Sequence, residues 1–277
     1  ERYRMPQIRL NDCLFHYTDQ GSGPPLLLLH GLGSSERDWE YQVPALTEHY
    51  RVLCLDSRGH GQTEKGGNGY SIPLFAADCL AFIQAMELEK PHIVGLSMGG
   101  MIAFQLATNS PETPASLTIV NSAPEVIPRR PAEYWMAGKR LFFAHILPMR
   151  AIASGLGKML FPKPDQQHHR DTFQARWCEN DRRSYLASLR AIVGWGVSAQ
   201  LDRIVCPVLV VSADKDYTPV EQKRNYVSRL GDARLEVIAD SRHATPVDQP
   251  EAFNSLLLDF LQQVDATRTL THEIDPA

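Results

Sequence analysis

Short apolar runs rich in Leu, Val and Ile recur along the chain, and each is bounded by Gly, Pro or polar residues. Between most of them lie stretches long enough for helices, such as 72–86 and 99–108. The runs are continuous rather than alternating, which is typical of strands that are covered on both faces of a parallel sheet. The pattern therefore predicts an α/β fold with a doubly wound, mostly parallel sheet. The expected strands cover 26–29, 52–55, 92–94, 117–120, 208–211 and 235–238.

The alternation of strands and helices is interrupted once, between residues 122 and 202. This region begins with three prolines and continues with helical stretches at 134–147 and 184–195. We expect a helical lid over 122–202, inserted between the first part of the core (1–121) and its second part (203–277). Such a lid would lie over the carboxyl ends of the strands, where open α/β sheets bind their ligands.

Aromatic residues are frequent in the expected lid. Each is predicted to lie in the lid's own core, and together they indicate an apolar pocket. They are Trp135, Phe142, Phe143, Trp177 and Trp195. The end of the chain after Val264 has no apolar periodicity, so we expect a mobile polar tail there.

Composition narrows the classes of function. The chain has 277 residues, of which 43% are hydrophobic and 22% charged, as in ordinary globular proteins. A formal net charge of -4 gives no electrostatic basis for binding nucleic acid or an anionic membrane. The five cysteines are scattered without any CxxC pair, so we expect free thiols and a cytoplasmic location rather than disulfides or a zinc site. Because no apolar run reaches ~18 residues and no basic and apolar leader is present, we expect neither a membrane span nor a signal peptide.

The segment "GLSMGG" at 95–100 joins a buried strand to an apolar helix. A strand that turns sharply into a helix forces the residue at the apex into a strained conformation, and the residues two positions away must then be small. Ser97 is at this apex between Gly95 and Gly99. The segment predicts that Ser97 is held above the sheet as a nucleophile, although small residues also occur in ordinary tight turns.

A serine hydroxyl needs a histidine base, and an acid that orients the base, to become a nucleophile. Of the ten histidines, His243 follows the last expected strand, which brings it to the same edge of the sheet as Ser97. His168 and His169 lie in the polar "DQQHHR" of the lid, where we expect a solvated surface. His243 is therefore the predicted base.

Four segments together resemble the α/β-hydrolase fold superfamily, and they occur in that family's order over nearly the whole chain. They are "HGLG" at 30–33, "DSRGHG" at 56–61, "GLSMGG" at 95–100 and "DSRHATPVDQP" at 240–250. "DSRGHG" lacks the spacing and the lysine of a phosphate-binding loop, so we interpret it as a structural turn beside the site.

The resemblance implies roles for further residues. In the family, the acid lies three residues beyond the small residue that closes a late strand, which favours Asp216 over Asp214 in "SADKDYTP". Relatives that take the acid from the preceding strand end have no counterpart here, because this chain has Asn121 there. The family's oxyanion donors are two backbone N–H groups, which correspond to Leu32 and Met98.

These features predict a serine hydrolase that cleaves esters of small to medium acyl or aryl acids through an acyl-enzyme, with a small-molecule substrate and without a metal or organic cofactor. A serine nucleophile argues against the haloalkane dehalogenases and epoxide hydrolases of this fold, which use aspartate. Enol-lactonase, carbon–carbon bond hydrolase and cofactor-free perhydrolase chemistries stay open, as does a non-catalytic ligand-binding role.

Overall fold

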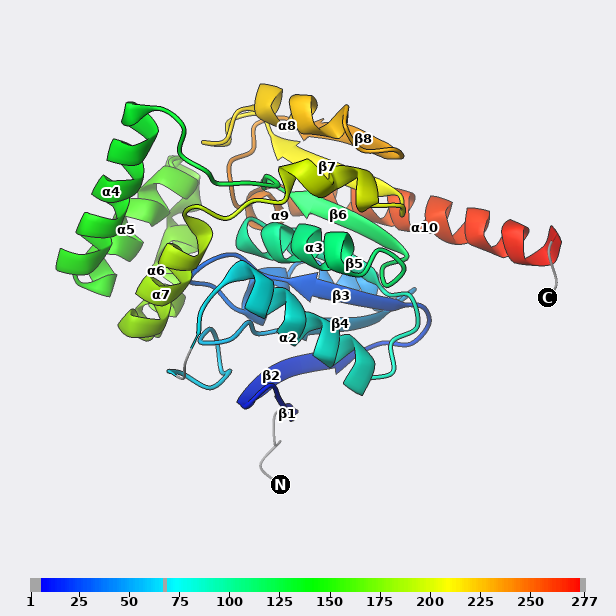
Figure 1. Cartoon of the computed structure of the whole chain (residues 1–277). Coiled ribbons are helices and arrows are strands. Elements are labelled where there is room, and N and C mark those ends of the chain that lie inside the picture. Colours follow the sequence, from blue (N-terminus) through cyan, green and yellow to red (C-terminus); the bar gives the residue numbers. More distant parts are fainter. Residues whose placement is uncertain (1–5, 67–68, 275–277) are drawn as a thin grey trace.

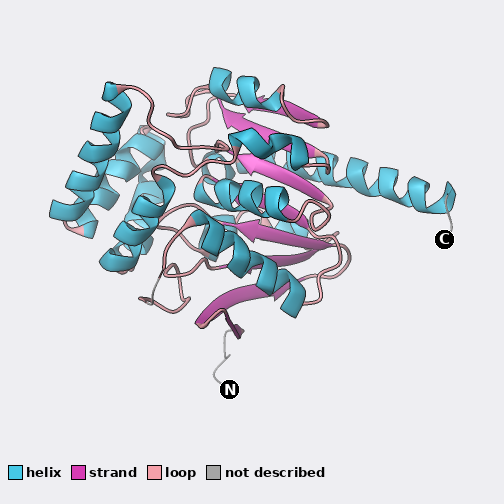
Figure 2. Cartoon of the chain, viewed as in Figure 1, coloured by secondary structure: helices cyan, strands magenta, loops and turns pink. Residues whose placement is uncertain are grey.

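An eight-stranded sheet forms the centre of the computed structural model, which describes residues 6–66 and 69–274 (Figures 1 and 2). The strand order is β1-β2-β4-β3-β5-β6-β7-β8, and the six strands from β3 to β8 pair in parallel. The prediction of a doubly wound, mostly parallel sheet is therefore confirmed. The strands are β1 (Gln7–Leu10), β2 (Cys13–Gln20), β3 (Pro25–Leu29), β4 (Arg51–Leu55), β5 (His92–Leu96), β6 (Ser116–Val120), β7 (Val208–Ala213) and β8 (Ala233–Ile238).

The antiparallel edge made by β1 and β2 was not among the predicted strands. The two strands form a hairpin, and β2 then pairs with β4. Asn11 and Asp12 have φ of 45° and 61°, as expected for the tight turn that joins twisted strands. The sequence of this hairpin has no continuous apolar run, because the side chains of β1 and β2 are buried alternately or only in part.

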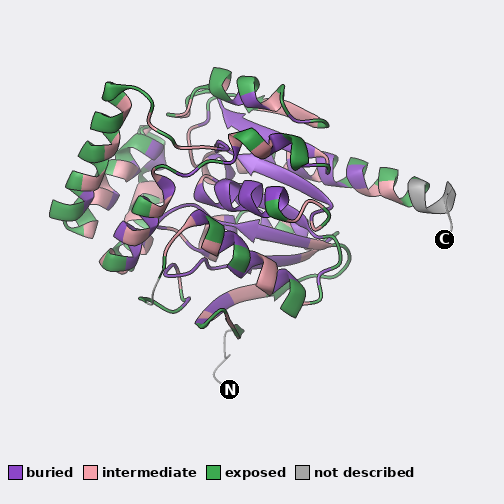
Figure 3. Cartoon of the chain, viewed as in Figure 1, coloured by how far each residue is buried: buried purple, intermediate pink, exposed green. Residues whose placement is uncertain are grey.

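Each central strand contributes to two separate hydrophobic cores, one on each face of the sheet. In β3, Leu27 and Leu29 face the core built with α2 (Ile72–Ala85) and α3 (Met98–Asn109), whereas Leu26 and Leu28 face the other. This second core includes side chains of α1 (Val43–Leu46) and α10 (Pro250–Ile274). Burial on both faces is the reason the strands read as continuous apolar runs (Figure 3).

Four helices separate β6 from β7 in the sequence and stand together at the carboxyl ends of the parallel strands (Figure 1). They are α4 (Pro131–Ile146), α5 (Met149–Leu160), α6 (Gln167–Cys178) and α7 (Arg182–Ile192), with a short turn, η2 (Pro164–Gln166), between α5 and α6. We call α4 to α7 the inserted helices. The chain re-enters the core through η3 (Ser198–Arg203). The remaining helical segments are η1 (Glu36–Trp39), α8 (Val220–Val227) and α9 (Thr245–Asp248).

The aromatic residues of the insertion divide into two groups. Trp177 and Trp195 are buried, as predicted. Trp135, Phe142 and Phe143 are 65%, 59% and 41% exposed, so the prediction that they form a core was wrong. The physical reason is that α4 buries only Ala144 and leaves its aromatic side chains at a surface.

The predicted mobile tail after Val264 was also wrong for residues 265–274, because α10 continues to Ile274. Asp265 accepts hydrogen bonds from the Tyr50 hydroxyl and from His92 Nε2, each at 3.0 Å. These contacts join the helix to the edge of the core just where the apolar pattern ends. The last predicted tail residues, 275–277, lie outside the described part. Within the described residues, none of the helices combines the length and apolarity that crossing a membrane requires.

Candidate active site

A strained turn between β5 and α3 presents Ser97. Its φ of 54° and ψ of -111° lie outside the regions that L-residues favour. A side chain at Gly95 would collide with the Gly99 carbonyl, and one at Gly99 would collide with the Leu29 carbonyl. The two glycines therefore permit the close packing that holds Ser97 at the apex.

The end of β6 and the loop after β3 border this turn. The Ser97 N–H donates to the Val120 carbonyl at 2.9 Å, and the Ser122 hydroxyl donates to the Ser97 carbonyl at 2.7 Å. A Cβ atom built on Gly31 would lie 3.7 Å from Ser97 Cβ, so the loop that carries Leu32 borders the serine. Met98 is the first residue of α3, where the helix itself offers its N–H no acceptor.

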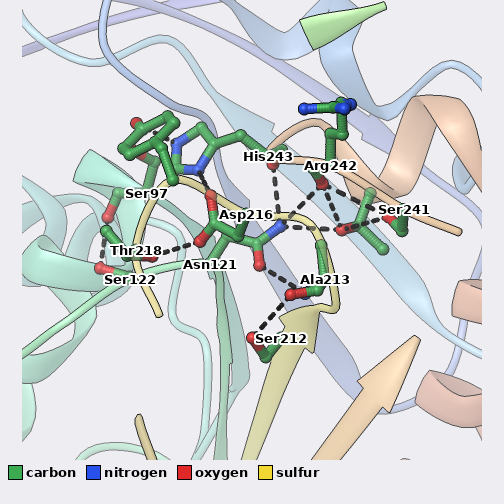
Figure 4. A network of polar contacts seen from close by, with 12 residues as sticks. Ser97, Asn121, Ser122, Ser212, Ala213, Asp216, Thr218, Ser241, Arg242 and His243 are labelled. Carbon is green, nitrogen blue, oxygen red and sulfur yellow. Dashed lines mark hydrogen bonds and ion pairs between the residues drawn. The ribbon is translucent and has the colours of Figure 1, made fainter. Parts of the chain in front are cut away.

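His243 and Asp216 meet beside this turn (Figure 4). His243 Nδ1 lies 2.8 Å from Asp216 Oδ1, and the carboxylate is fully buried. Burial by itself raises the pKa of Asp216, but the hydrogen bond and charge of His243 and the Lys223 ammonium outweigh it and lower the pKa to about 2. An ionised Asp216 can only accept, so His243 carries its proton on Nδ1 and leaves Nε2 as an acceptor.

Asp214, the alternative acid, has a different partner. It is exposed, and its Oδ1 accepts the Ser241 N–H at 2.9 Å. The structure thus brings Asp216 to His243 and places Asp214 as a brace for the loop that leads to the histidine.

Lys223 is a site residue that the sequence did not reveal. It comes from α8, is 1% exposed, and its Nζ lies 2.7 Å from Asp216 Oδ2. The same ammonium donates to the Thr218 carbonyl and hydroxyl, each at 2.8 Å. In the sequence it lies within the polar run "EQKRN", which is typical of a solvated helix face.

Asn121, which the sequence analysis set aside as a missing acid, ties the site together instead. Its side-chain N–H groups donate to the carbonyls of His243 at 2.9 Å and Arg242 at 3.3 Å, and to the Thr245 hydroxyl at 2.8 Å. Its Oδ1 accepts the Ala213 N–H at 2.8 Å. One side chain at the end of β6 therefore positions both the end of β7 and the loop of His243 (Figure 4).

Tyr217 is the third residue that was missed, although it directly follows Asp216. Its hydroxyl lies 2.7 Å from His243 Nε2, and the two ring centroids are 4.1 Å apart at an interplanar angle of 30°. Desolvation of the hydroxyl raises the pKa of Tyr217 to about 12, although half of the residue's surface is accessible, and the charge of Arg140 acts in the opposite direction. The phenol is therefore protonated at neutral pH and donates to His243.

Two cavities meet at Ser97. The smaller, of about 390 Å³, is lined by apolar side chains of α5 and α6, and the larger, of about 880 Å³, by residues of α4 and of the loop that precedes it. Both include Leu32, Ser97, Arg140, Tyr217 and His243 in their walls.

Two predictions about side chains in the insertion need correction at these cavities. His169 was expected, with His168, on a solvated surface. It is instead half-buried and lines the smaller cavity, where the centroid of its ring lies 5.3 Å from that of Phe161. Trp135 and Phe143 line the larger cavity. These side chains line cavities at the carboxyl ends of the strands. The order of apolar and polar residues along the chain does not show where such a cavity lies.

The predicted structural segments are also joined at this edge of the sheet. The Ser57 N–H donates to His30 Nε2 at 2.9 Å, and His30 Nδ1 contacts the Gly31 carbonyl at 2.8 Å. Asp56 accepts the Glu36 N–H at 2.7 Å and the Gln62 N–H at 2.8 Å. "HGLG" and "DSRGHG" thus hold each other in place, and both nitrogens of His30 are engaged.

Comparison with known proteins gives a consistent result. The model of the alpha/beta hydrolase family matches residues 26–256. A Variovorax paradoxus protein named "Putative carbamate hydrolase RutD" is 31% identical over 268 residues, with 91% of this chain and 97% of that protein covered. The 3-oxoadipate enol-lactonase 2 of Acinetobacter baylyi is 26% identical and covers 89% of this chain and 91% of its own length. The solved structure of the enol-lactonase from Burkholderia xenovorans LB400 has a TM-score of 0.85 at 26% identity, with 93% of this chain and 100% of that chain covered.

Proposed function

Because the chain belongs to the alpha/beta hydrolase family, we propose that it hydrolyses carboxylic esters through an acyl-enzyme formed on Ser97. The observation that carries the proposal is the 2.8 Å contact between His243 Nδ1 and Asp216 Oδ1 beside a serine held in a strained turn. Ser97 also opens on both cavities, so a substrate can place one part in each.

In the proposed reaction, the Ser97 oxygen attacks the ester carbonyl while its proton passes to His243. Asp216 stabilises the imidazolium that forms, and the N–H groups of Leu32 and Met98 hold the oxyanion. The C–O bond to the alcohol then breaks, and the proton from His243 goes to the leaving oxygen. Water repeats these steps on the acyl-enzyme. None of these proposed steps needs a metal or an organic cofactor.

The cavities support a division of the substrate into two parts. Apolar side chains dominate the smaller cavity, among them Leu156, Leu160, Phe173 and Trp177. We assign the acyl or aryl group to this space, whose volume of about 390 Å³ suits small to medium groups. The larger cavity, with Arg129, Arg130 and Lys139 in its walls, would take the alcohol part.

The experiment compares the wild type with Ser97→Ala on p-nitrophenyl acetate, butyrate and octanoate. We expect a burst of one equivalent of p-nitrophenol from the wild type and a loss of kcat by at least about 1,000-fold in Ser97→Ala. Ser228→Ala makes the same chemical change at an exposed serine and serves as the control. An inert wild type, or an alanine variant that keeps its rate, would contradict the proposal.

The acid is tested separately with Asp216→Asn and Asp214→Asn. We expect a large loss of kcat only in Asp216→Asn, because the amide no longer stabilises the imidazolium. A loss confined to Asp214→Asn would reverse the assignment.

A second substrate class, cyclic esters, is favoured by the relatives that are named enol-lactonases. A lactone undergoes the same attack on its carbonyl, but its alcohol stays attached to the acyl group. A panel of lactones, open-chain esters and carbamates with matched acyl groups, compared by kcat/KM, would separate these classes. The carbamates are included because of the name of the Variovorax paradoxus relative.

A further inference from the structure

One side of α4 is apolar and exposed. The large apolar side chains of this side, which we call the α4 face, are each between 41% and 65% exposed, and they are Tyr134, Trp135, Met136, Phe142, Phe143 and Ile146. The helical repeat brings most of them to the same side, while Ala144 is buried and α4 contacts α7. Figure 3 shows α4 as mostly exposed at the outer edge of the inserted helices. Contiguous apolar surface of this kind marks an interaction site in soluble proteins.

The α4 face extends beyond the substrate space. Trp135, Met136 and Phe143 line the larger cavity, and because they are also exposed, that cavity opens on this face. Phe142 and Ile146 line neither cavity. A small substrate bound at Ser97 therefore leaves the outer part of the face uncovered, and a larger partner is needed to bury it.

Cations lie within the α4 face and at both of its ends. The Lys139 ammonium lies 5.0 Å from the centroid of the Trp135 ring and 5.9 Å from that of Phe143. Arg130 precedes the helix and Arg150 follows it, and both are exposed. In the part of the chain that the structure describes, Arg130, Lys139 and Arg150 have no carboxylate partner within ion-pair distance. Their charges are therefore available to an anionic partner.

The acids beside α4 do not neutralise these cations. Glu125 is paired with Arg129, and Glu133 accepts the backbone N–H groups of Arg129 and Arg130 at the start of the helix. The charge of the chain is in fact unevenly distributed. Residues 122–202 contain twelve Lys and Arg against seven Asp and Glu, whereas the whole chain has 28 against 32. The net charge of the whole chain thus conceals a basic insertion.

We propose that the α4 face binds the surface of an anionic phospholipid bilayer. Aromatic side chains beside Lys and Arg are typical of protein surfaces at the boundary between lipid and water, where each cation is attracted to anionic headgroups. A second copy of this chain fits less well, because a symmetric contact would bring the same cations together. The docking does not depend on the proposed reaction. It places the bilayer beside the mouth of the larger cavity, so an ester dissolved in lipid would reach Ser97 from there.

The first test measures binding to vesicles. We expect the protein to sediment with vesicles of equal parts phosphatidylcholine and phosphatidylglycerol, to be released by salt, and to bind pure phosphatidylcholine far more weakly. Trp135 is the only one of the four tryptophans that is exposed. Its emission should shift to the blue on the anionic vesicles and be quenched by brominated lipid, which reports contact at α4 itself.

The apolar part of the face is tested with Phe142→Ser/Ile146→Ser. We expect binding to the anionic vesicles to weaken at least about tenfold, because two side chains no longer bury apolar surface in the bilayer. Val205→Ser/Leu270→Ser, at positions that are 62% and 60% exposed elsewhere on the molecule, is the matched control and should bind as the wild type does. Because Phe142 and Ile146 line neither cavity, hydrolysis of p-nitrophenyl butyrate in solution should not change.

The charged part is tested with Arg150→Gln, which should weaken binding to the anionic vesicles about fivefold. Arg203→Gln removes an equally exposed cation from η3 and should have no effect. Unfolding temperatures of all variants establish that a lost affinity is not a lost fold.

The remaining outcomes each overturn the docking. It fails if the wild type ignores anionic vesicles, or binds pure phosphatidylcholine equally well. It fails if the variants of α4 bind as tightly as the wild type, since another surface is then responsible. A dimer in light scattering that Phe142→Ser/Ile146→Ser dissociates would show that a second copy covers the face. If the protein binds the anionic vesicles as expected but hydrolyses no ester, the proposed function fails and the docking stands.

Discussion

Lys223 places a buried positive charge behind the acid of the proposed triad, and this should set the pH at which the enzyme becomes active. Its ammonium lies 2.7 Å from Asp216 Oδ2, while Asp216 Oδ1 lies 2.8 Å from His243 Nδ1. Burial lowers the pKa of Lys223, but Asp216 opposes this and favours the charged form. The lysine therefore shares the carboxylate with His243 and disfavours the imidazolium.

The size of this effect follows from Coulomb's law. Two unit charges about 4 Å apart interact by about 4 kcal/mol at an effective dielectric constant of about 20, and the Asp216 carboxylate between the ammonium and the imidazole roughly doubles that separation, which leaves a repulsion of about 2 kcal/mol. That energy corresponds to a change of about 1.5 pH units. In Lys223→Met the imidazolium that forms during catalysis loses this repulsion. The acidic limb of the kcat/KM profile should therefore move upward by 1 to 2 pH units, on this same order-of-magnitude reasoning.

The assay is the pH dependence of kcat/KM on p-nitrophenyl butyrate, measured only where the variant is folded. This check is needed because removal of one partner of a buried ion pair costs stability, although Asp216 keeps His243 and the Thr218 hydroxyl as donors. Lys215→Met removes the same charge from an exposed neighbour that pairs with Asp240, and it should leave the limb unchanged. A limb that stays in place in Lys223→Met, or moves to lower pH, would refute the reasoning.

Three further changes have defined outcomes. Gly99→Ala forces a methyl group against the Leu29 carbonyl and should lower the free energy of unfolding by at least about 3 kcal/mol in urea titrations. Asn121→Ala removes the hydrogen bonds that join the end of β7 to the His243 loop. We expect kcat to fall and the free energy of unfolding to decrease by about 2–4 kcal/mol. An unchanged kcat would show that the His243 loop keeps its position without Asn121. Burial raises the pKa of Asp248 to about 6, so the folded protein favours the protonated carboxyl. The stability that this carboxyl contributes is complete below about pH 4 and is lost as the pH rises through about 6. Asp248→Asn should thus gain stability relative to the wild type across that range, by up to about 3 kcal/mol, and a difference that is flat with pH would contradict this.

The parts of the structure that could be predicted from the sequence are those where backbone geometry allows few residue types. The central strands were found because burial on both faces requires continuous apolar residues. The turn at Ser97 was found because only glycine fits at Gly95 and Gly99. Both inferences depend on sterics within a short segment, which a single sequence contains.

The parts that could not be predicted depend on contacts between distant segments. Lys223 has the appearance of a surface lysine, because its burial follows from α8 packing beside the loop of Asp216 rather than from its own neighbours. The helix beyond Val264 is held by Tyr50 and His92, which lie far away in the sequence. Tyr217 could have been predicted as a neighbour of His243, because it directly follows the acid. The direction of its hydroxyl, however, does not follow from the sequence.

These two kinds of residue also divide the work of the site. The position of Ser97 is fixed by the sheet, through close contacts that tolerate no substitution. The proton chemistry depends instead on the loop after β7, where Asp216 and Tyr217 contact opposite nitrogens of His243, and on the single lysine that α8 adds. Asn121 joins the end of β7 to the loop of His243 through backbone groups, so these bonds do not depend on the identity of the residues at 216 and 217. A substitution at Lys223 can therefore change the working pH while the nucleophile stays in place, which makes this position the most informative one to vary.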